Sequence, residues 1–402
     1  MKATQRPAPP RPPADASIWV MAGQSNMQGC GAFRDASKPD RRVWCFTQGH
    51  RWEIAKEPLH NLIESAAPID RKLRMEATPP EIAAKDFQEV RRYWRKRSAG
   101  SGAGLGIAFG SAYAKATGHP VGLIAAAHGG TTLEQWSPSR RGEGLDSLYG
   151  AMLERVRLAG GNLRGILWYQ GESDTLPRES ETYAERFTEW VAAVRRDTGR
   201  PRLPIVTVQL GCVADVNRDA ASWERVRQAQ LELPRRIPRL AVVSSIDLGL
   251  KDSIHLDAPD LQRLGRRMAR VALGLAGEGK PQGDGPRLSR FAVGANKGGL
   301  GETTLFFSGV VGGWRPERQI TGFSVLDETG RPHPANAVTA AFRHRRWPRA
   351  IVVRTLAPLQ AGEWIAYGAG LFPICNAVDE ADMSPLAFRT QIEAGLPGSV
   401  QL

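Results

Sequence analysis

The 402 residues of the chain exceed what one ordinary hydrophobic core organises, so the length predicts two domains. Hydrophobic residues make up 42% and charged residues 24%, as in globular proteins, and no apolar run approaches the roughly 20 residues of a membrane span. The formal net charge is +13, but the basic residues are dispersed apart from short clusters such as 343–346. No nucleic-acid-binding signature accompanies them, so we expect solvated surface charge and no nucleic-acid partner.

The first residues of the chain and its cysteines bear on compartment. Residues 1–16 are rich in proline and lack an apolar segment, so we expect a disordered lead-in rather than a secretory signal. The four cysteines are widely spaced and fit no metal template, which predicts free thiols: Cys30, Cys45, Cys212 and Cys375. Both features favour a cytoplasmic location.

Short apolar runs alternate with helical patterns through the first two thirds of the chain. The expected strands are 18–21, 121–127, 165–169, 204–210 and 240–244. Helices are expected through 116 and over 146–159, 181–196, 223–233 and 260–273. This alternation predicts a five-stranded parallel sheet covered on both faces, a three-layer α/β/α architecture.

One long segment interrupts this pattern. Residues 29–98 are irregular, with weak helical character over 81–97, and an excursion of this length is usually functional or mobile. The glycine-rich stretch 101–110 invites comparison with a phosphate-binding loop. However, it lacks a Gly-Lys-Ser/Thr sequence and a preceding strand, so we expect these glycines to allow close packing at a helix entry.

The pattern changes again near residue 277. Residues 277–286 have the composition of a linker, and short alternating segments follow at 303–307, 322–326, 337–342, 350–354 and 364–367. We therefore expect a small antiparallel β domain over 287–402, preceded by an α/β domain over 17–276.

Polar residues follow three of the expected strands. Ser25, the Gly129-Gly130 turn and Gln170 each come directly after a strand, and a later loop carries Asp252 and His255. The carboxyl ends of strands in open α/β sheets are where ligands and nucleophiles lie. Ser25 taken alone is equally consistent with a helix cap, and His255 and Gln170 alone also fit structural roles.

Taken together, these residues have the chemistry of an activated serine. A serine hydroxyl becomes a good nucleophile when an imidazole removes its proton, and a carboxylate such as Asp252 can hold that imidazole in one tautomer. The negative oxygen formed by attack on an ester needs fixed donors, and backbone amides and the Gln170 side chain can supply them. The serine lacks the second glycine of a Gly-x-Ser-x-Gly elbow, which disfavours an ordinary α/β-hydrolase.

Four strings carry a family resemblance: Gly23-Gln-Ser-Asn-Met27, Gly129-Gly-Thr131 with Trp136 after it, Trp168-Tyr-Gln-Gly-Glu-Ser-Asp174 and Asp252-Ser-Ile-His255. They resemble the four blocks of SGNH hydrolases, which have a flavodoxin-like fold. More narrowly, they resemble the sialate O-acetylesterase and acetylxylan-esterase-like branch, in which Gln replaces the usual Asn of the third block. The resemblance covers roughly residues 17–275. It continues at Tyr367, Pro373-Ile-Cys-Asn376 and Ser384-Pro-Leu-Ala-Phe-Arg-Thr390.

The resemblance implies a role for each matching residue. Ser25 would be the nucleophile, His255 the general base and acid, and Asp252 its orienting carboxylate. The oxyanion hole would consist of the Ser25 amide, the amide of Gly129 or Gly130, and Gln170. The implied reaction removes an O-acetyl group from a carbohydrate and uses no metal or organic cofactor.

The residues next to these four strings' proposed catalytic groups would have supporting roles. Gln24 and Asn26 flank the nucleophile and would support the site or contact substrate. Glu172 and Asp174 would order the loops, although Glu172 could instead compete with Asp252 as the histidine partner. Trp136 either packs in the core or stacks on a sugar ring, and His128 is expected to be a hydrogen-bonded structural residue.

Two alternatives remain. The same residues could hydrolyse another acyl ester, such as acetylated xylan or a small-molecule ester. In a different class, the chain could be a non-catalytic glycan-binding protein in which the β domain does the binding.

Overall fold

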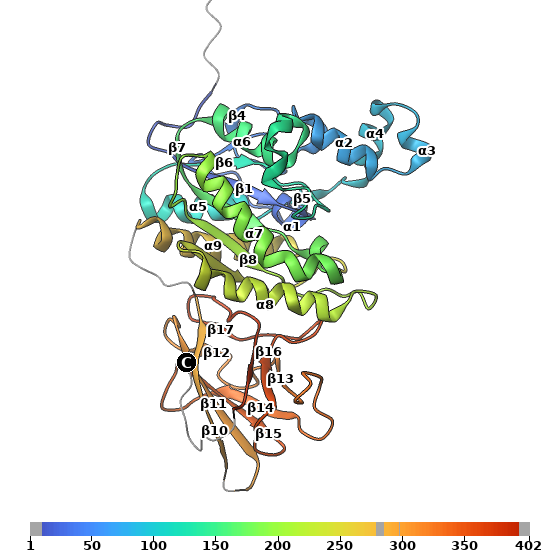
Figure 1. Cartoon of the computed structure of the whole chain (residues 1–402). Coiled ribbons are helices and arrows are strands. Elements are labelled where there is room, and N and C mark those ends of the chain that lie inside the picture. Colours follow the sequence, from blue (N-terminus) through green and yellow to red (C-terminus); the bar gives the residue numbers. More distant parts are fainter. Residues whose placement is uncertain (1–9, 279–284, 297, 394–402) are drawn as a thin grey trace, which may run out of the picture. The chain divides into compact units, whose positions relative to one another are not determined.

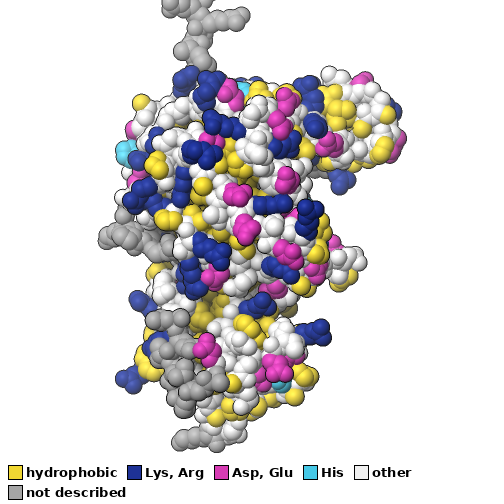
Figure 2. Space-filling model, viewed as in Figure 1, with side chains coloured by type: hydrophobic (Ala, Val, Ile, Leu, Met, Phe, Trp, Pro, Cys, Tyr) yellow, Lys and Arg dark blue, Asp and Glu magenta, His cyan; other side chains and the backbone are white. Residues whose placement is uncertain are grey.

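The computed structural model describes residues 10–278, 285–296 and 298–393 (Figure 1). Part of each expected terminal or linking segment lies outside these residues: 1–9 of the lead-in, 279–284 of the linker, and 297 and 394–402 of the β domain. Within the described ranges, no helix has the length and apolar character needed to cross a membrane. Figure 2 shows Lys and Arg side chains spread over the visible face rather than gathered in one patch.

The described chain forms two compact units. The first contains residues up to 173 together with 185–206 and 255–278, and the second contains 174–184, 207–254 and the residues from 285 onwards. The second unit thus combines the expected β domain with segments from the α/β region. The expected domain boundaries at 276 and 287 stay predictions.

The α/β region is built on one seven-stranded sheet of order β4-β3-β6-β1-β7-β8-β9. Five strands confirm the predicted ones: β1 (Ser17–Gly23), β6 (Val121–Ala125), β7 (Asn162–Tyr169), β8 (Ile205–Gln209) and β9 (Leu240–Ser244). The sequence analysis was wrong about the strand count, because β3 (Val43–Phe46) and β4 (Trp52–Ile54) come from the segment expected to be irregular. β3 runs parallel to β6 and β4 antiparallel to β3, so the sheet is mixed.

The nine α-helices of the described residues confirm the predicted ones and add four. Those predicted are α5 (Gly106–Thr117), α6 (Leu148–Ala159), α7 (Pro177–Asp197), α8 (Ala220–Arg236) and α9 (Ala258–Ala276). The additional ones are α1 (Ser25–Gln28), α2 (Pro68–Glu76), α3 (Pro80–Ala83) and α4 (Phe87–Arg97). The last two fall in the stretch expected to have weak helical character. Helices α2 and α3 begin with a proline in the first turn, and the Asp86 side chain caps the start of α4. Both features favour a helix start at these positions.

Two buried tryptophans show how helices cover both faces of the sheet. Trp19 pairs with Gly165 and Ala22 with Trp168, so Trp19 and Trp168 point to opposite faces because side chains alternate along a strand. Trp19 contacts the aromatic rings of α5, whereas Trp168 packs on Phe187 and Trp190 of α7. The expected three-layer arrangement is confirmed.

The second unit contains the antiparallel sheets of the carboxyl-terminal region. One sheet has the order β10-β11-β15-β14, formed by Arg287–Ala295, Gly301–Ser308, Ala350–Thr355 and Val338–Arg343. Another has the order β13-β16-β18, formed by Phe323–Leu326, Trp364–Tyr367 and Phe388–Gln391. β12 (Trp314–Arg315) pairs with β17 (Val378–Asp379), and in the first unit β2 (Gly31–Ala32) pairs with β5 (Ser101–Ala103). The expected antiparallel β fold is confirmed.

Buried polar side chains join the parts of this second unit. Gln209, the last residue of β8, donates to the carbonyls of Arg227 and Ala387 and accepts from the Ala387 amide at 2.7 Å. Arg227 of α8 donates to the carbonyls of Gly368 and Gly370. These bonds connect α8 to the strands that follow residue 285. The linker-like composition near residue 277 did not predict them.

Candidate active site

The site begins where β1 ends beside β7. Gly23 has φ of +127°, and a Cβ atom there would lie 2.2 Å from the carbonyl oxygen of Tyr169. Only glycine fits this position, because any side chain would collide with the neighbouring strand. The chain therefore turns directly from the strand into α1, whose first residue is Ser25.

The structure brings Ser25 and His255 together from positions 230 residues apart. The Ser25 Oγ and His255 Nε2 atoms lie 3.0 Å apart, and both side chains are half-buried. His255 lies three residues before α9 begins at Ala258, so the amino-terminal end of that helix fixes the loop carrying the imidazole. This separation is within hydrogen-bonding reach for proton transfer from the hydroxyl.

Asn26 connects three segments around this pair. Its Nδ2 atom donates to Glu172 Oε1 at 2.7 Å, and its Oδ1 atom accepts from the Leu256 amide at 3.0 Å. Asn26 is 1% exposed and Glu172 is 3% exposed. The bridge thus links the residue after Ser25 to the residue after His255, and it also links both to the loop after β7.

Gln24 holds the same loop from the other side of Ser25. Its backbone amide donates to the Tyr169 carbonyl at 2.8 Å, and its Oε1 atom accepts weakly from the amides of Gly171 and Ser173. Gln24 is buried, so in this structure it supports the loop and offers no surface to a ligand. Asn26 is buried in the same way.

The glycine turn after β6 lies against α1. The Gly129 amide donates to Gln28 Oε1 at 2.9 Å, and a Cβ atom on Gly129 would lie 3.3 Å from Ser25 Cβ. Gly129 is half-buried, whereas Gly130 is exposed and has φ of +73°. Gln28, which sequence reasoning missed, therefore occupies one of the two glycine amides.

Gln170 and Trp136 meet at Thr131. The Nε2 atom of Gln170 donates to the Thr131 carbonyl at 3.1 Å. Trp136 Nε1 donates to Thr131 Oγ1, and its ring packs edge-on against Trp168. Trp136 is 0% exposed, so burial favours the packing role over sugar stacking.

Asp174 and Asp252 belong to the second unit and are described within it. Asp252 is exposed in a loop and accepts from the Ile254 amide at 3.0 Å, while Asp174 is 0% exposed at the end of a short 3-10 turn. Their predicted roles toward His255 and the loops stay predictions.

A buried charged cluster lies behind the glycine turn, and sequence reasoning missed it. Asp70 of α2 and Arg155 of α6 are both 0% exposed and form an ion pair at 2.6 Å, and Ser65 donates to the same Asp70 oxygen. The other Asp70 oxygen lies 2.7 Å from His128 Nδ1. His128 directly precedes the glycine turn, and its backbone amide donates to the Gly23 carbonyl.

The charge states in this cluster follow from the contacts. Burial alone would raise the pKa of Asp70, but Arg155, His128 and Ser65 together hold the pKa of this carboxyl well below its usual range. Burial lowers the pKa of His128, and Asp70 only partly opposes this. The imidazole is therefore neutral at neutral pH, with its Nδ1 proton donated to the carboxylate. This confirms the structural role expected for His128.

His60 contacts the carboxyl-terminal end of α1. It is 4% exposed, and its Nδ1 atom lies 3.0 Å from the Gln28 carbonyl at the end of α1. Burial lowers the pKa of His60 to about 4. Because a carbonyl oxygen only accepts, the neutral ring donates from Nδ1. His60 and Asp70 both come from the segment in which no motif was recognised; a histidine and an aspartate next to apolar residues were the only signal.

The arrangement can perform acyl transfer on a serine. A half-exposed hydroxyl beside an imidazole, with the first amide of α1 and a glutamine amide nearby, is the set of groups that such chemistry requires. Over the described ranges, no three His, Cys, Asp or Glu side chains cluster so as to hold a metal ion.

The chain is similar to several known proteins. The family model described as carbohydrate esterase, sialic acid-specific acetylesterase, matches residues 15–274. The probable carbohydrate esterase At4g34215 of Arabidopsis thaliana is 28% identical over 289 residues, which are 67% of this chain and 93% of that protein. The crystal structure of XAC1771, a carbohydrate acetylesterase from Xanthomonas citri, matches with a TM-score of 0.63 at 21% identity, covering 93% of this chain and 80% of that chain. At that identity the likeness shows the fold.

Proposed function

Because the chain belongs to the carbohydrate esterase family of sialic acid-specific acetylesterases, we propose that it removes O-acetyl groups from a carbohydrate with Ser25 as nucleophile. Membership in this family makes it a carboxylic ester hydrolase, as the resemblance implied. The observation that carries the proposal is the 3.0 Å separation of Ser25 Oγ and His255 Nε2. The remaining steps follow from what these two groups can do.

In the first step, His255 Nε2 accepts the Ser25 proton as Oγ attacks the acetyl carbonyl carbon. The carbonyl oxygen becomes negatively charged, and the protonated imidazole then gives its proton to the departing sugar hydroxyl. This step leaves an acetyl ester on Ser25. Water, activated by the same imidazole, releases acetate and restores the serine.

Three donors are proposed for the negative oxygen. The Ser25 amide begins α1 and has no carbonyl four residues earlier within the helix to receive it. The side-chain amide of Gln170, which is held against the Thr131 carbonyl, is the second donor. Of the two glycines, Gly130 fits the third position better, because the Gly129 amide already donates to Gln28. Each such donor typically contributes about 2.7–4 kcal/mol to the barrier reduction.

The partner of the His255 Nδ1 atom is proposed to be Asp252, three residues before it. A carboxylate there would hold the tautomer that leaves Nε2 free to accept, and it would stabilise the imidazolium. Glu172 is the alternative. Its bond to Asn26 supports a loop-ordering role instead, since that bond engages the Glu172 Oε1 atom.

Acetate release from defined substrates tests the proposal. Purified full-length protein is assayed against O-acetylated sialic acid, acetylated xylan and p-nitrophenyl acetate. We expect hydrolysis of the sialic acid ester, and we expect Ser25→Ala and His255→Ala to lower kcat by about 10³-fold or more.

Ser253→Ala is the matched control, because Ser253 is an exposed serine two residues before His255. This variant should retain wild-type turnover. Preference for acetylated xylan would support the alternative substrate on the same residues. Turnover by Ser25→Ala equal to that of the wild type would refute the serine mechanism altogether.

A further inference from the structure

One face of the sheet β10-β11-β15-β14 is not used to form the core. Leu305, Ile351 and Val353 are 0% exposed and point inward. Side chains alternate along strands, so the neighbouring residues point to the other side. The paired positions Arg290↔Phe306, Glu302↔Arg354 and Phe342↔Val352 share this outer face.

The hairpin between β14 and β15 adds an exposed tryptophan to the outer face. Trp347 is 44% exposed, and its ring stacks on His344 with centroids 4.4 Å apart. It also packs against Phe306 at 5.4 Å. The turn is fixed from within, because the Arg346 and Trp347 amides both donate to His344 Nδ1. The indole is therefore held in place before any ligand arrives.

Arginines surround this ring. Arg345, Arg346 and Arg349 are exposed in the same hairpin, and within the described part of the chain none of them forms an ion pair. Arg290 lies over the Phe306 ring at 3.8 Å, so it extends the positive charge along the sheet. The cluster 343–346, which the sequence analysis assigned to solvated surface, thus forms the edge of an aromatic surface.

A groove continues from the hairpin across the outer face. Its volume is about 1330 Å³, and its arginines outnumber its carboxylates: Arg318, Arg343, Arg345, Arg346 and Arg354 against Glu302 and Glu317. Glu317 pairs with Arg343 at 2.6 Å and Glu302 with Arg354 at 3.0 Å. After this pairing, the groove retains a net positive charge.

We propose that the outer face, defined by Arg290, Phe306, Arg345, Arg346 and Trp347, is a non-catalytic binding site for a carboxylate-bearing carbohydrate chain. A fixed indole packs against the apolar C–H face of a sugar ring. Guanidinium groups bind carboxylates with two parallel hydrogen bonds. The site goes beyond the proposed esterase activity, because it would hold an acidic polymer while the chemistry takes place elsewhere.

The observations favour a sugar over a single-stranded nucleic acid. Stacking of successive bases needs several open rings. On the described outer face, Phe306 and Phe342 are only half-exposed, and each is covered by an arginine, Arg290 or Arg354. Trp347 alone offers a large exposed ring, which suits one stacked sugar with charged neighbours.

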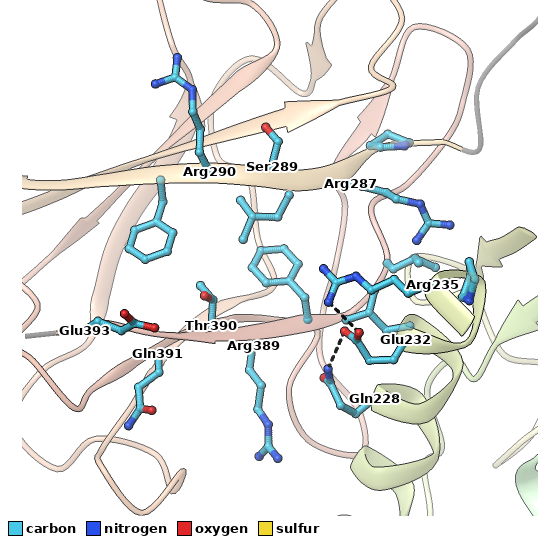
Figure 3. A pocket seen from close by; sticks show the side chains of 17 residues that line it. Gln228, Glu232, Arg235, Arg287, Ser289, Arg290, Arg389, Thr390, Gln391 and Glu393 are labelled. Carbon is cyan, nitrogen blue, oxygen red and sulfur yellow. Dashed lines mark hydrogen bonds and ion pairs between the residues drawn. The ribbon is translucent and has the colours of Figure 1, made fainter. Parts of the chain in front are cut away.

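A second hollow in the same unit lacks an exposed aromatic ring on which a sugar could stack, because the phenylalanines that line it, Phe291 and Phe388, are buried. It has a volume of about 440 Å³ and lies between β10 and β18 (Figure 3). Figure 3 shows Arg235 and Gln228 of α8 directed at the Glu232 carboxylate. Arg235 donates to Glu232 at 2.7 Å and Gln228 does so at 3.5 Å, so the Arg235 guanidinium is already paired with a carboxylate there.

Binding of the full-length protein to unacetylated polymers tests the proposal without requiring hydrolysis. Affinity is measured for polysialic acid and polygalacturonate, with neutral xylan and a single-stranded oligonucleotide as comparisons. We expect binding to an acidic polymer that Trp347→Ala weakens at least tenfold. Phe372→Ala is the control, since Phe372 is 55% exposed in the same unit; it should change affinity less than twofold.

Hydrolysis of p-nitrophenyl acetate is measured in parallel, and Trp347→Ala should leave it unchanged. Loss of polymer binding without loss of hydrolysis would show that the binding face and the esterase site act independently, so either proposal can fail without the other. Three results would overturn the carbohydrate assignment. The protein could bind neither acidic polymer, Trp347→Ala and Phe372→Ala could lower the affinity equally, or the protein could bind the oligonucleotide more tightly than the acidic polymers.

Discussion

The loops that follow β1, β6 and β7 and the segment between α1 and α5 both surround Ser25, but they contribute different things. The loops supply groups that can touch a reacting ester, namely Ser25 and Gln170, and the bridge from Asn26 to Glu172. The long segment supplies only buried supports, Asp70 and His60, which hold the glycine turn and the end of α1.

The difference shows where each kind of residue must be placed. Ser25 and Gln170 directly follow strand ends, where the sheet exposes them, so their places in the sequence are constrained. Supporting groups such as Asp70 and His60 need only contact residues behind the site, so they can come from an inserted segment. Removing members of each set therefore separates loss of chemistry from loss of support.

The largest stability effect is expected at the buried ion pair. Asp70→Ala leaves Arg155 as an unpaired charge with no exposed surface, so the free energy of unfolding should fall by about 3–5 kcal/mol. Denaturant unfolding at pH 7 measures this loss. The kcat of the remaining folded protein should also fall, since His128 loses its acceptor.

A double substitution controls for the charge itself. Asp70→Leu combined with Arg155→Met removes both partners, and it should recover much of the stability while leaving His128 unsupported. If the double variant regains full kcat, the cluster does not position the glycine turn, and the supporting role given to this segment is wrong.

The next largest effect is expected at the bridge between Ser25 and His255. Asn26→Ala removes the bonds to Glu172 and to the Leu256 amide, so kcat should fall about 10- to 100-fold with little change in KM. Steady-state assays with a soluble acetyl ester measure this, and thermal unfolding checks that the variant is folded.

Glu172→Gln sharpens this test. The glutamine keeps an oxygen that can accept from Asn26 but loses the negative charge. Activity within about tenfold of the wild type is expected if Glu172 only orders the loop. A loss as large as that of Asp252→Asn would instead make Glu172 the partner of the imidazole.

The smallest effect is expected at His60 and depends on pH. Its pKa falls from an unfolded value of about 6.5 to about 4 in the fold, so its contribution is present above about pH 6.5 and is lost as the pH falls toward 4. We expect the stability advantage of the wild type over His60→Gln to shrink by about 2 kcal/mol between pH 7 and pH 5.

Comparing the two proteins at each pH cancels the titration of all other groups. Urea unfolding gives both free energies. A difference that stays constant across this range would mean that His60 is not buried in its neutral form, and that α1 has another support.

Much of this organisation could be read from the sequence. Five strands, the helices that follow them and the Ser25–His255 pairing came from apolar periodicity and from polar residues after strand ends. β3 was missed because Val43–Phe46 lies within the irregular segment, outside the alternation of apolar runs and helical patterns that marked the other strands. The hydrogen bonds of Gln28, Asp70 and Arg155 depend on tertiary packing, which no local spacing encodes.

The sequence also predicted only part of the β unit. Alternation predicted β11, β13, β14, β15 and β16, but β10, β12, β17 and β18 were missed. The exposure of Trp347 was not predicted, because a single tryptophan among arginines is compatible with burial or exposure. Only the packing on His344 and Phe306 gives it a fixed, open position.

Covalent labelling of the nucleophile tests the central claim most directly. The wild-type protein and its Ser25→Ala and His255→Ala variants are treated with a fluorophosphonate, and the adduct is located by peptide mass spectrometry. The proposed mechanism predicts one adduct on Ser25, no adduct in Ser25→Ala and strongly slowed labelling in His255→Ala. A wild-type adduct on another serine, with Ser25 unmodified, would contradict it.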